Sequence, residues 1–195
     1  MRREATIERA TKETDIRVNV VLDGAGQASV DSGVPFFDHM LSAFARHGYF
    51  DLDLKAVGDL EIDAHHTMED IGLAMGRALS DALGDKSGIT RFGCSFVPMD
   101  EALARVVVDL SGRPYLGYRV NTRDSEAGGV NTRLFREYFQ ALVNTAAITL
   151  HIDLLYGEEV HHCLEAVYKA FGRALGQAVG LDPRCTGVPS TKGLL

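Results

Sequence analysis

The sequence has few cysteines, and none of them is paired in a recognisable motif. Cys94, Cys163 and Cys185 are widely spaced, and no CxxC occurs. An odd number of separated cysteines indicates neither a disulfide framework nor a zinc ribbon. We therefore expect reduced thiols and a cytoplasmic protein.

Long apolar runs and an excess of basic charge are also missing. No segment approaches the roughly 18 apolar residues of a membrane helix. The first fifteen residues are polar and contain no apolar core of a secretory signal. The formal net charge is −7, whereas nucleic-acid binding favours a basic face. We expect no membrane and no nucleic-acid partner, although a few local cations can still bind a phosphorylated ligand.

What the chain does contain is an internal repeat. Residues 65–84 and 161–180 are identical at ten of twenty positions, and residues 39–54 align with 137–152. In each copy helix-period apolar residues are followed by alternation typical of a strand. Residues 16–31 predict a strand pair with a glycine-containing turn, and residues 104–120 predict two more strands, broken at Ser-Gly-Arg-Pro. The repeat predicts one α+β domain of two half-domains, about 1–90 and 91–195, each a mixed sheet packed against helices.

The repeat also doubles an HHxxE motif, at His65-His66-Glu69 and at His161-His162-Glu165. On a helix, residues four apart share a face, whereas neighbours diverge by about 100°. The first histidine and the glutamate can therefore hold one ion, while the second histidine serves another. Imidazole and carboxylate together suit manganese, iron or zinc. A satisfied surface pair is the alternative for one such motif, but packing does not require two.

Two further candidates occupy equivalent positions upstream of the motifs, His39 and Glu137. The ligand hypothesis then contains five histidines and three carboxylates. We predict that one ion takes His65, Glu69 and His162 and that the other takes His161, Glu165 and His66. His39 and Glu137 complete the two sets, one apiece. His151 is interpreted as structural, and His47 as part of a helix C-terminus.

Several long segments resemble the imidazoleglycerol-phosphate dehydratase family, in its monofunctional form. They are FFDHML (36–41), HHTMEDIGLAMG (65–76), LSGRPYLGY (110–118), HHCLEAVYKAFGRAL (161–175) and PSTKG (189–193). The resemblance implies a duplicated fold like that of ribosomal protein S5 domain 2. It also implies a homo-oligomeric shell of 24 subunits with active sites at subunit interfaces, and two Mn²⁺ per site. Some members have histidine where this chain has Glu137, so this ligand is the least secure.

The reaction implied is the dehydration of imidazole glycerol phosphate to imidazole acetol phosphate in histidine biosynthesis, through an imidazolate bound between two metals. The family's phosphate-binding positions match Arg91, Arg113, Lys169, Ser190 and Lys192. Glu13 matches a glutamate that reaches the substrate's glycerol chain, and with Glu69 and Glu165 it completes the catalytic candidates. Simpler structural interpretations stay open. In these, Lys169 forms only a helix salt bridge with Glu165, Arg113 is a turn residue, and the STKG segment is a disordered tail. A metallohydrolase and a metal-storage shell are the rival functions.

Overall fold

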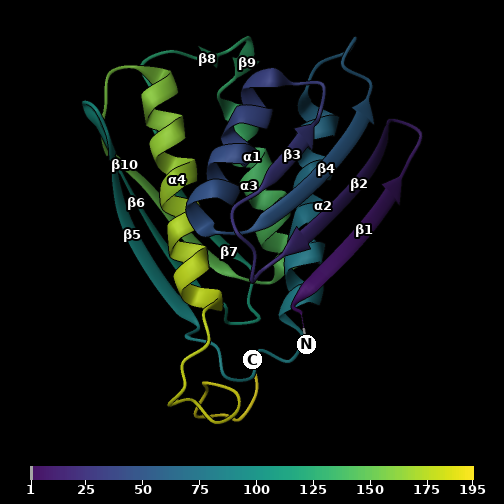
Figure 1. Cartoon of the computed structure of the whole chain (residues 1–195). Coiled ribbons are helices and arrows are strands. Elements are labelled where there is room, and N and C mark those ends of the chain that lie inside the picture. Colours follow the sequence, from purple (N-terminus) through teal and green to yellow (C-terminus); the bar gives the residue numbers. More distant parts are fainter. Residues whose placement is uncertain (1) are drawn as a thin grey trace.

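The computed structural model describes residues 2–195, and two four-stranded sheets enclose four helices in it (Figure 1). The first half contains β1 (Glu4–Ala10), β2 (Thr14–Val21), β3 (Ala28–Asp31), α1 (Pro35–Gly48), β4 (Asp51–Gly58) and α2 (His65–Leu83). The second contains β5 (Phe92–Met99), β6 (Ala102–Asp109), β7 (Tyr115–Arg119), β8 (Glu126–Ala127), β9 (Val130–Asn131), α3 (Arg133–Ala146), β10 (Thr149–Tyr156) and α4 (Val160–Val179). The predicted α+β duplication is therefore confirmed.

The two sheets have the same strand order and the same register. The orders are β1-β2-β4-β3 and β5-β6-β10-β7. Val21 faces Asp51 in the first sheet, and the equivalent Asp109 faces Thr149 in the second. Alternation explains the strands: Ile16 and Val18 are fully buried, while Arg17 between them is exposed. Buried apolar residues of both sheets face the helices and form one continuous core.

The helices of the two halves cross each other at matching glycines. The main helix–helix contacts are α2 on α3 and α1 on α4. A Cβ added to Gly76 would lie 2.3 Å from the carbonyl oxygen of Leu142, and one added to Gly172 would lie 2.3 Å from that of Phe44. Only glycine permits such close backbone contact. The pseudo-twofold relation therefore extends to individual backbone atoms.

One expectation about local pairing was wrong. β2 and β3 do not form the strand pair expected from residues 16–31, because β4 lies between them. The two strands expected from residues 104–120 are present as β6 and β7, with β10 between them. The connection after β2 instead crosses the start of β4, where the Asp51 carboxylate accepts hydrogen bonds from the backbone N–H groups of Ala25 and Gln27. β3 and β7 then run parallel to β4 and β10. The strands β1 and β5, which the sequence patterns did not predict, complete each sheet.

The loop before the first helix of each half, α1 or α3, differs in length between the halves. Three residues, 32–34, separate β3 from α1, whereas thirteen, 120–132, separate β7 from α3. The extra residues form the β8–β9 hairpin, which lies over one end of the helix layer (Figure 1). Across residues 2–195, no helix combines the length and the apolar character needed to cross a membrane.

Candidate metal centre and substrate-binding groups

Both HHxxE motifs lie in the first turns of helices whose backbone is capped by an acidic side chain. α2 begins at His65 and α4 at Val160. Glu159 accepts hydrogen bonds from the N–H groups of His161 and His162 at 3.1 and 2.9 Å, and Asp63 accepts one from that of His65 at 2.7 Å. An acidic group at a helix N-terminus satisfies free N–H groups and opposes the helix dipole. These caps fix where each motif's side chains leave the helix.

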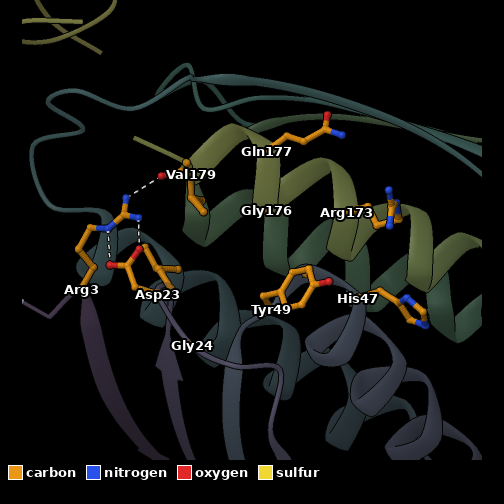
Figure 2. Close-up of a pocket in the computed structure, with 12 residues that line it drawn as sticks. Arg3, Asp23, Gly24, His47, Tyr49, Arg173, Gly176, Gln177 and Val179 are labelled. Atoms are coloured by element: carbon orange, nitrogen blue, oxygen red, sulfur yellow. Dashed lines mark hydrogen bonds and ion pairs between the residues drawn. The ribbon is translucent and has the colours of Figure 1, made fainter. Parts of the chain in front are cut away.

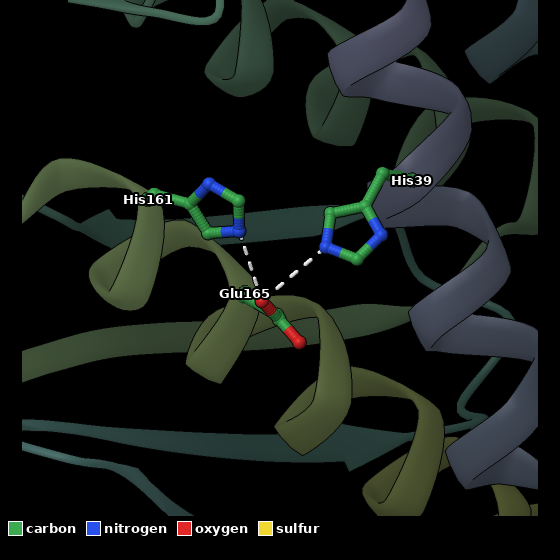
Figure 3. A group of neighbouring side chains, drawn as sticks. All are labelled: His39, His161 and Glu165. Atoms are coloured by element: carbon green, nitrogen blue, oxygen red, sulfur yellow. Dashed lines mark hydrogen bonds and ion pairs between the residues drawn. The ribbon is translucent and has the colours of Figure 1, made fainter.

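Three of the predicted ligands converge within the single chain. Nε2 of His39 on α1 and Nε2 of His161 on α4 lie 3.3 and 3.1 Å from the same carboxylate oxygen, Oε2 of Glu165 (Figure 3). One ligand atom from each lies within 4.8 Å of the others. The cluster forms because α1 packs on α4, and it therefore draws on both repeats.

The carboxylate at the centre of this cluster is held ionised. Burial alone raises the pKa of Glu165, but the hydrogen bond and charge of Lys169, together with His39, outweigh it and lower the pKa below its ordinary value. Nζ of Lys169 lies 2.8 Å from Oε1 of Glu165. The structure thus has the helix salt bridge that was the simpler interpretation of Lys169. An ionised Glu165 is the form that can bind a cation.

The equivalent residues of the other repeat do not converge to the same degree. Nε2 of His65 lies 3.6 Å from Oε2 of Glu69, in the same i,i+4 relation. Glu137 on α3, which corresponds to His39, is paired instead with its neighbour Arg136 at 3.2 Å. The first histidine and the glutamate of each motif thus share a face, as expected from helix geometry.

The second histidine of each motif points to a different carboxylate. Nδ1 of His66 lies 2.9 Å from Asp59 and 3.8 Å from Glu13. Nδ1 of His162 lies 2.8 Å from Glu101. The hydrogen bond to Asp59 raises the pKa of His66, and that to Glu101 raises the pKa of His162. Backbone N–H of Glu159 and then His162 lower the pKa of Glu101 to about 2.

Asp59 and Glu101 were missed by sequence reasoning, although one signal for Glu101 was present. When β2 and β6 are superposed by register, Glu101 occupies the position of Glu13. Each lies just before its strand and beside the second histidine of its own repeat. Carrying the repeat alignment upstream to these strands would have found it. Asp59 has no equivalent signal in the sequence.

Two of the predicted phosphate-binding cations converge on one aspartate. Nε of Arg91 lies 2.7 Å from Asp109, and Nη2 of Arg113 lies 3.8 Å from it. Nη1 of Arg91 also donates to the carbonyl oxygen of Pro189 at 2.8 Å, which holds the C-terminal segment nearby. In that segment the backbone N–H of Lys192 donates to Oγ of Ser190.

The cation group and the metal cluster lie at opposite ends of α4. The backbone N–H of Arg91 donates to the carbonyl oxygen of Ala178 near the helix C-terminus, whereas His161 lies in its first turn. Seventeen residues at 1.5 Å each separate them by about 25 Å. A ligand much shorter than this distance can touch both kinds of group only if they come from two copies of the chain.

One cavity of the single chain lies away from both groups, whereas another includes the predicted ligand Glu137. A cavity of about 390 Å³, in Figure 2, lies where the ends of α1 and α4 meet, lined by residues such as Arg3, His47 and Tyr49. It includes none of the predicted site residues. α1 ends at Gly48, so His47 lies in its last turn as expected, and Tyr49 after it adopts the left-handed conformation with φ 59°.

Comparisons with known proteins agree on one family. A family model described as imidazoleglycerol-phosphate dehydratase matches residues 32–175. The Geobacter metallireducens enzyme of that name is 55% identical over 195 residues, all of both chains. The Bordetella petrii enzyme is 57% identical over 194 residues, 99% of this chain and all of that one.

Two solved structures of the same name have this fold. That from Staphylococcus aureus has a TM-score of 0.83 at 38% identity, covering 92% of this chain and 99% of the other. That from Pyrococcus furiosus, in complex with (S)-C348, has a TM-score of 0.84 at 39% identity, covering 97% and 100%. The chain belongs to the imidazoleglycerol-phosphate dehydratase family, hydro-lyases of histidine biosynthesis.

Proposed function

We propose that the chain dehydrates imidazole glycerol phosphate to imidazole acetol phosphate. The reaction uses two divalent ions, Mn²⁺, that bind the substrate's imidazole ring. The observation that carries the proposal is the convergence of His39 and His161 on one oxygen of Glu165. Ligands at about 2.1 Å from one ion lie roughly 3 Å apart, close to the separations found here. The donors are two imidazoles and a carboxylate, without thiolate, which suits manganese better than a soft metal.

The remaining ligands support a site completed by a second copy. His66 and His162 lie away from their own chain's clusters, each with Nδ1 on a carboxylate. Such a partner fixes the tautomer and leaves Nε2 free to bind a metal. We propose that they complete the clusters of neighbouring chains, so that the ions take the two predicted sets, with His39 beside His161 and Glu165.

The chemistry requires an electron store, because no carbonyl makes the reacting C–H bond acidic. The two histidine–glutamate clusters would hold the two ions, whose charge would stabilise a deprotonated ring able to supply electrons as the adjacent hydroxyl leaves. One C–O and one C–H bond break, water is released, and the enol formed becomes the ketone. Glu13, which is more than half exposed beside His66, is our candidate for moving the proton. Glu69 is a further candidate, whereas Glu165 is already engaged by Lys169.

The phosphate group is assigned to the cations at the other end of the helix layer. Arg91 and Arg113 surround Asp109, which orients Arg91 while leaving Arg113 two-thirds exposed. Arginine's planar group suits a phosphate, and Ser190 and Lys192 add further donors from the adjoining segment. Lys169 remains a substrate-binding candidate, although its partner in this chain is Glu165.

Because the metal cluster and the phosphate-binding cations of one chain lie far apart, we propose that copies of the chain assemble, and that they form a shell of 24 subunits. The outward face of the second sheet supports it: Phe92, Phe96 and Tyr115 are 56, 54 and 56% exposed. Phe92 and Phe96 lie on β5 and Tyr115 lies on β7, the two edge strands of this sheet, and an exposed apolar face of this kind is typical of an interface. Because the site needs a second copy, we propose that another copy of this chain covers this face. A phosphorylated substrate and unpaired cysteines are consistent with work in the cytoplasm.

An assay with imidazole glycerol phosphate tests the proposed function. Metal-depleted protein is expected to be inactive, and Mn²⁺ to restore formation of the ketone. Hydrolysis of esters or amides by the restored protein would favour the metallohydrolase, and metal uptake without turnover would favour the storage shell. Full activity with metal shown to be absent contradicts the proposed chemistry.

A further inference from the structure

The hairpin inserted in the second repeat reaches the metal cluster through one aromatic side chain. β8 lies against α4 and β9 against α3. Ala127 and Val130 of the hairpin are 3 and 4% exposed, so it is packed on the helix ends. Gly128 at its turn has φ +57°, and a Cβ placed there would lie 2.5 Å from Cβ of Phe36. The close contact at Gly128 therefore restricts the position of the Phe36 side chain.

Phe36 in turn packs on a proposed ligand. Its ring stands nearly perpendicular to that of His161, at 81°, with ring centres 5.2 Å apart. It also meets Phe135 edge-on at 6.0 Å. Phe36 is only 9% exposed. A ring confined between the hairpin and α3 restricts the rotamers open to His161, and it does so with Nε2 directed at Glu165.

The other repeat lacks this arrangement. Leu134 occupies the position of Phe36, three residues before Glu137 as Phe36 is before His39. The loop before α1 has no inserted hairpin. A cavity of about 530 Å³ lies between the start of α2 and the β8–β9 hairpin, and its lining includes Leu134, Asp63 and Ala64. Beside it, the contact of His65 with Glu69 is longer, and Glu137 is paired with Arg136.

We propose that Phe36, seated by the β8–β9 hairpin, is a positioning residue for His161, and that it makes the cluster of His39, His161 and Glu165 the first of the two metal subsites to fill. The inference rests on the proposed function. Its physical basis is that a site whose side chains are already ordered loses less conformational freedom when the ion binds. The cluster at His65 and Glu69 must be ordered during binding and fills second.

The test is a titration of the metal-depleted full-length protein with Mn²⁺ alone, free ion being followed by its paramagnetic resonance. The unaltered chain is expected to show a tight and a weak class of site in equal number. Phe36→Leu should weaken the tight class by about 10–100-fold, as loss of a ligand's supporting partner does. Leu134→Ala, at the equivalent position, should leave the tight class unchanged.

A matched pair of glycines separates positioning from general damage. Gly128 and Gly129 both have positive φ, but a Cβ on Gly129 meets nothing within 4 Å. Gly128→Ala should therefore weaken the tight class, and Gly129→Ala, with similar backbone strain, should not. Co²⁺ absorption adds a signature that reports ligand geometry: it should change at the first equivalent in Phe36→Leu and Gly128→Ala and stay the same in Gly129→Ala.

Three outcomes overturn the inference. The first is an unchanged tight class in folded Phe36→Leu. The second is equal weakening by the two glycine substitutions, which assigns the effect to strain alone. The third is an unaltered chain with two equal classes of site. Failure of the unaltered chain to bind Mn²⁺ at all is a different result, because it overturns the proposed function as well.

Discussion

The two repeats share the same interior packing but differ on the outward faces of their sheets. With β1 and β5 superposed by register, Glu4 and Glu8 of the first sheet correspond to Phe92 and Phe96 of the second. The glutamates face solvent, and the phenylalanines are more than half exposed at the same outward positions. Inside, both sheets bury apolar residues against helices that cross at matching glycines. Packing thus preserved the interior of the duplication, while the outer faces diverged toward separate roles.

Removal of the metal should produce the largest effect of these experiments, because we propose that the clusters of both repeats bind metal. We expect chelation to reduce dehydratase activity to background and to divide the assembled particle, since ligands on different chains stabilise the assembled state by mass action. Size-exclusion chromatography with light scattering measures the particle before and after chelation. A particle of unchanged size with its metal gone contradicts the role of the ions in assembly.

Phe96→Glu places on the second sheet the residue type that the first sheet has at the equivalent position, Glu8. Loss of a central aromatic at an interface costs about 2–4 kcal/mol per copy, so we expect smaller particles at equal protein concentration. Glu8→Ala on the first sheet is the matched control and should leave particle size unchanged. Sedimentation of both variants decides between them, and equal behaviour of the two would remove the distinction between the faces.

Glu165→Gln should destabilise the fold more than Glu69→Gln. The side chains of Glu165 and Lys169 are 10 and 17% exposed, so the amide leaves a nearly buried ammonium without its carboxylate. We expect a loss of about 2–3 kcal/mol in the free energy of unfolding, against less than about 0.5 kcal/mol for the half-exposed Glu69. Denaturant unfolding of the metal-free proteins measures both. Equal losses would mean that the two clusters are equally supported.

Arg113→Ala makes the second repeat resemble the first, which has Ala25 at this position when β2 and β6 are superposed. Loss of a charged hydrogen bond to phosphate is worth about 1.5–3 kcal/mol, or roughly 10–150-fold in KM. Lys192→Ala should act similarly, because both residues are assigned to the phosphate. Metal content, measured by elemental analysis, should stay the same. A normal KM in both variants refutes the assignment.

Asp153→Asn probes a buried carboxylate at the centre of the second sheet, whereas the first sheet has the exposed pair of Arg17 and Asp53 on its central strands. Asp153 is 4% exposed and accepts hydrogen bonds from Arg105 and Arg119, while Lys55 stands at the equivalent place on β4. We expect the substitution to reduce stability at neutral pH by about 1–2 kcal/mol. Thermal unfolding monitored by circular dichroism provides the measurement.

The pH dependence gives this last prediction a second readout. Burial raises the pKa of Asp153, but Arg119 and Arg105 outweigh it, and the pKa in the folded state lies below its ordinary value of 3.8. Its stabilisation is therefore present above pH 3.8 and is lost as the pH falls through the folded-state pKa. Asp153→Asn should flatten the acid limb of the stability curve. An unchanged acid limb would show that the group contributes nothing to acid sensitivity.

Local patterns predicted the elements of this fold better than their arrangement. The doubled histidines and the alternation after each helix predicted α2, α4, β4 and β10, because these signals depend on near neighbours in the chain. The insertion of β4 between β2 and β3 has no local signal, since it depends on the path of the connection past Asp51. The β8–β9 hairpin is likewise supported by tertiary packing on Phe36 and not by a strong strand pattern.

The candidate site divides in the same way. Helix spacing predicted that His161 and Glu165 share a face, and the repeat identified His39 as a ligand candidate without saying which set it joins. The packing of α1 on α4 places it beside His161 and Glu165. The partners of the second histidines, Asp59 and Glu101, come from loops that only the folded chain brings near. The distance of about 25 Å between the metal cluster and Arg91 is a property of helix length and chain path that no motif records.

The crossing of the helices has a consequence for the origin of the fold. Each repeat places its helices mainly against those of the other repeat, α1 on α4 and α2 on α3. Cut at the short linker between α2 and β5, the two halves would face each other through a self-complementary contact, as in an isologous homodimer. The present chain has the arrangement of such a dimer in covalent form, with the exposed aromatics of the outer sheet face and the β8–β9 hairpin on one half.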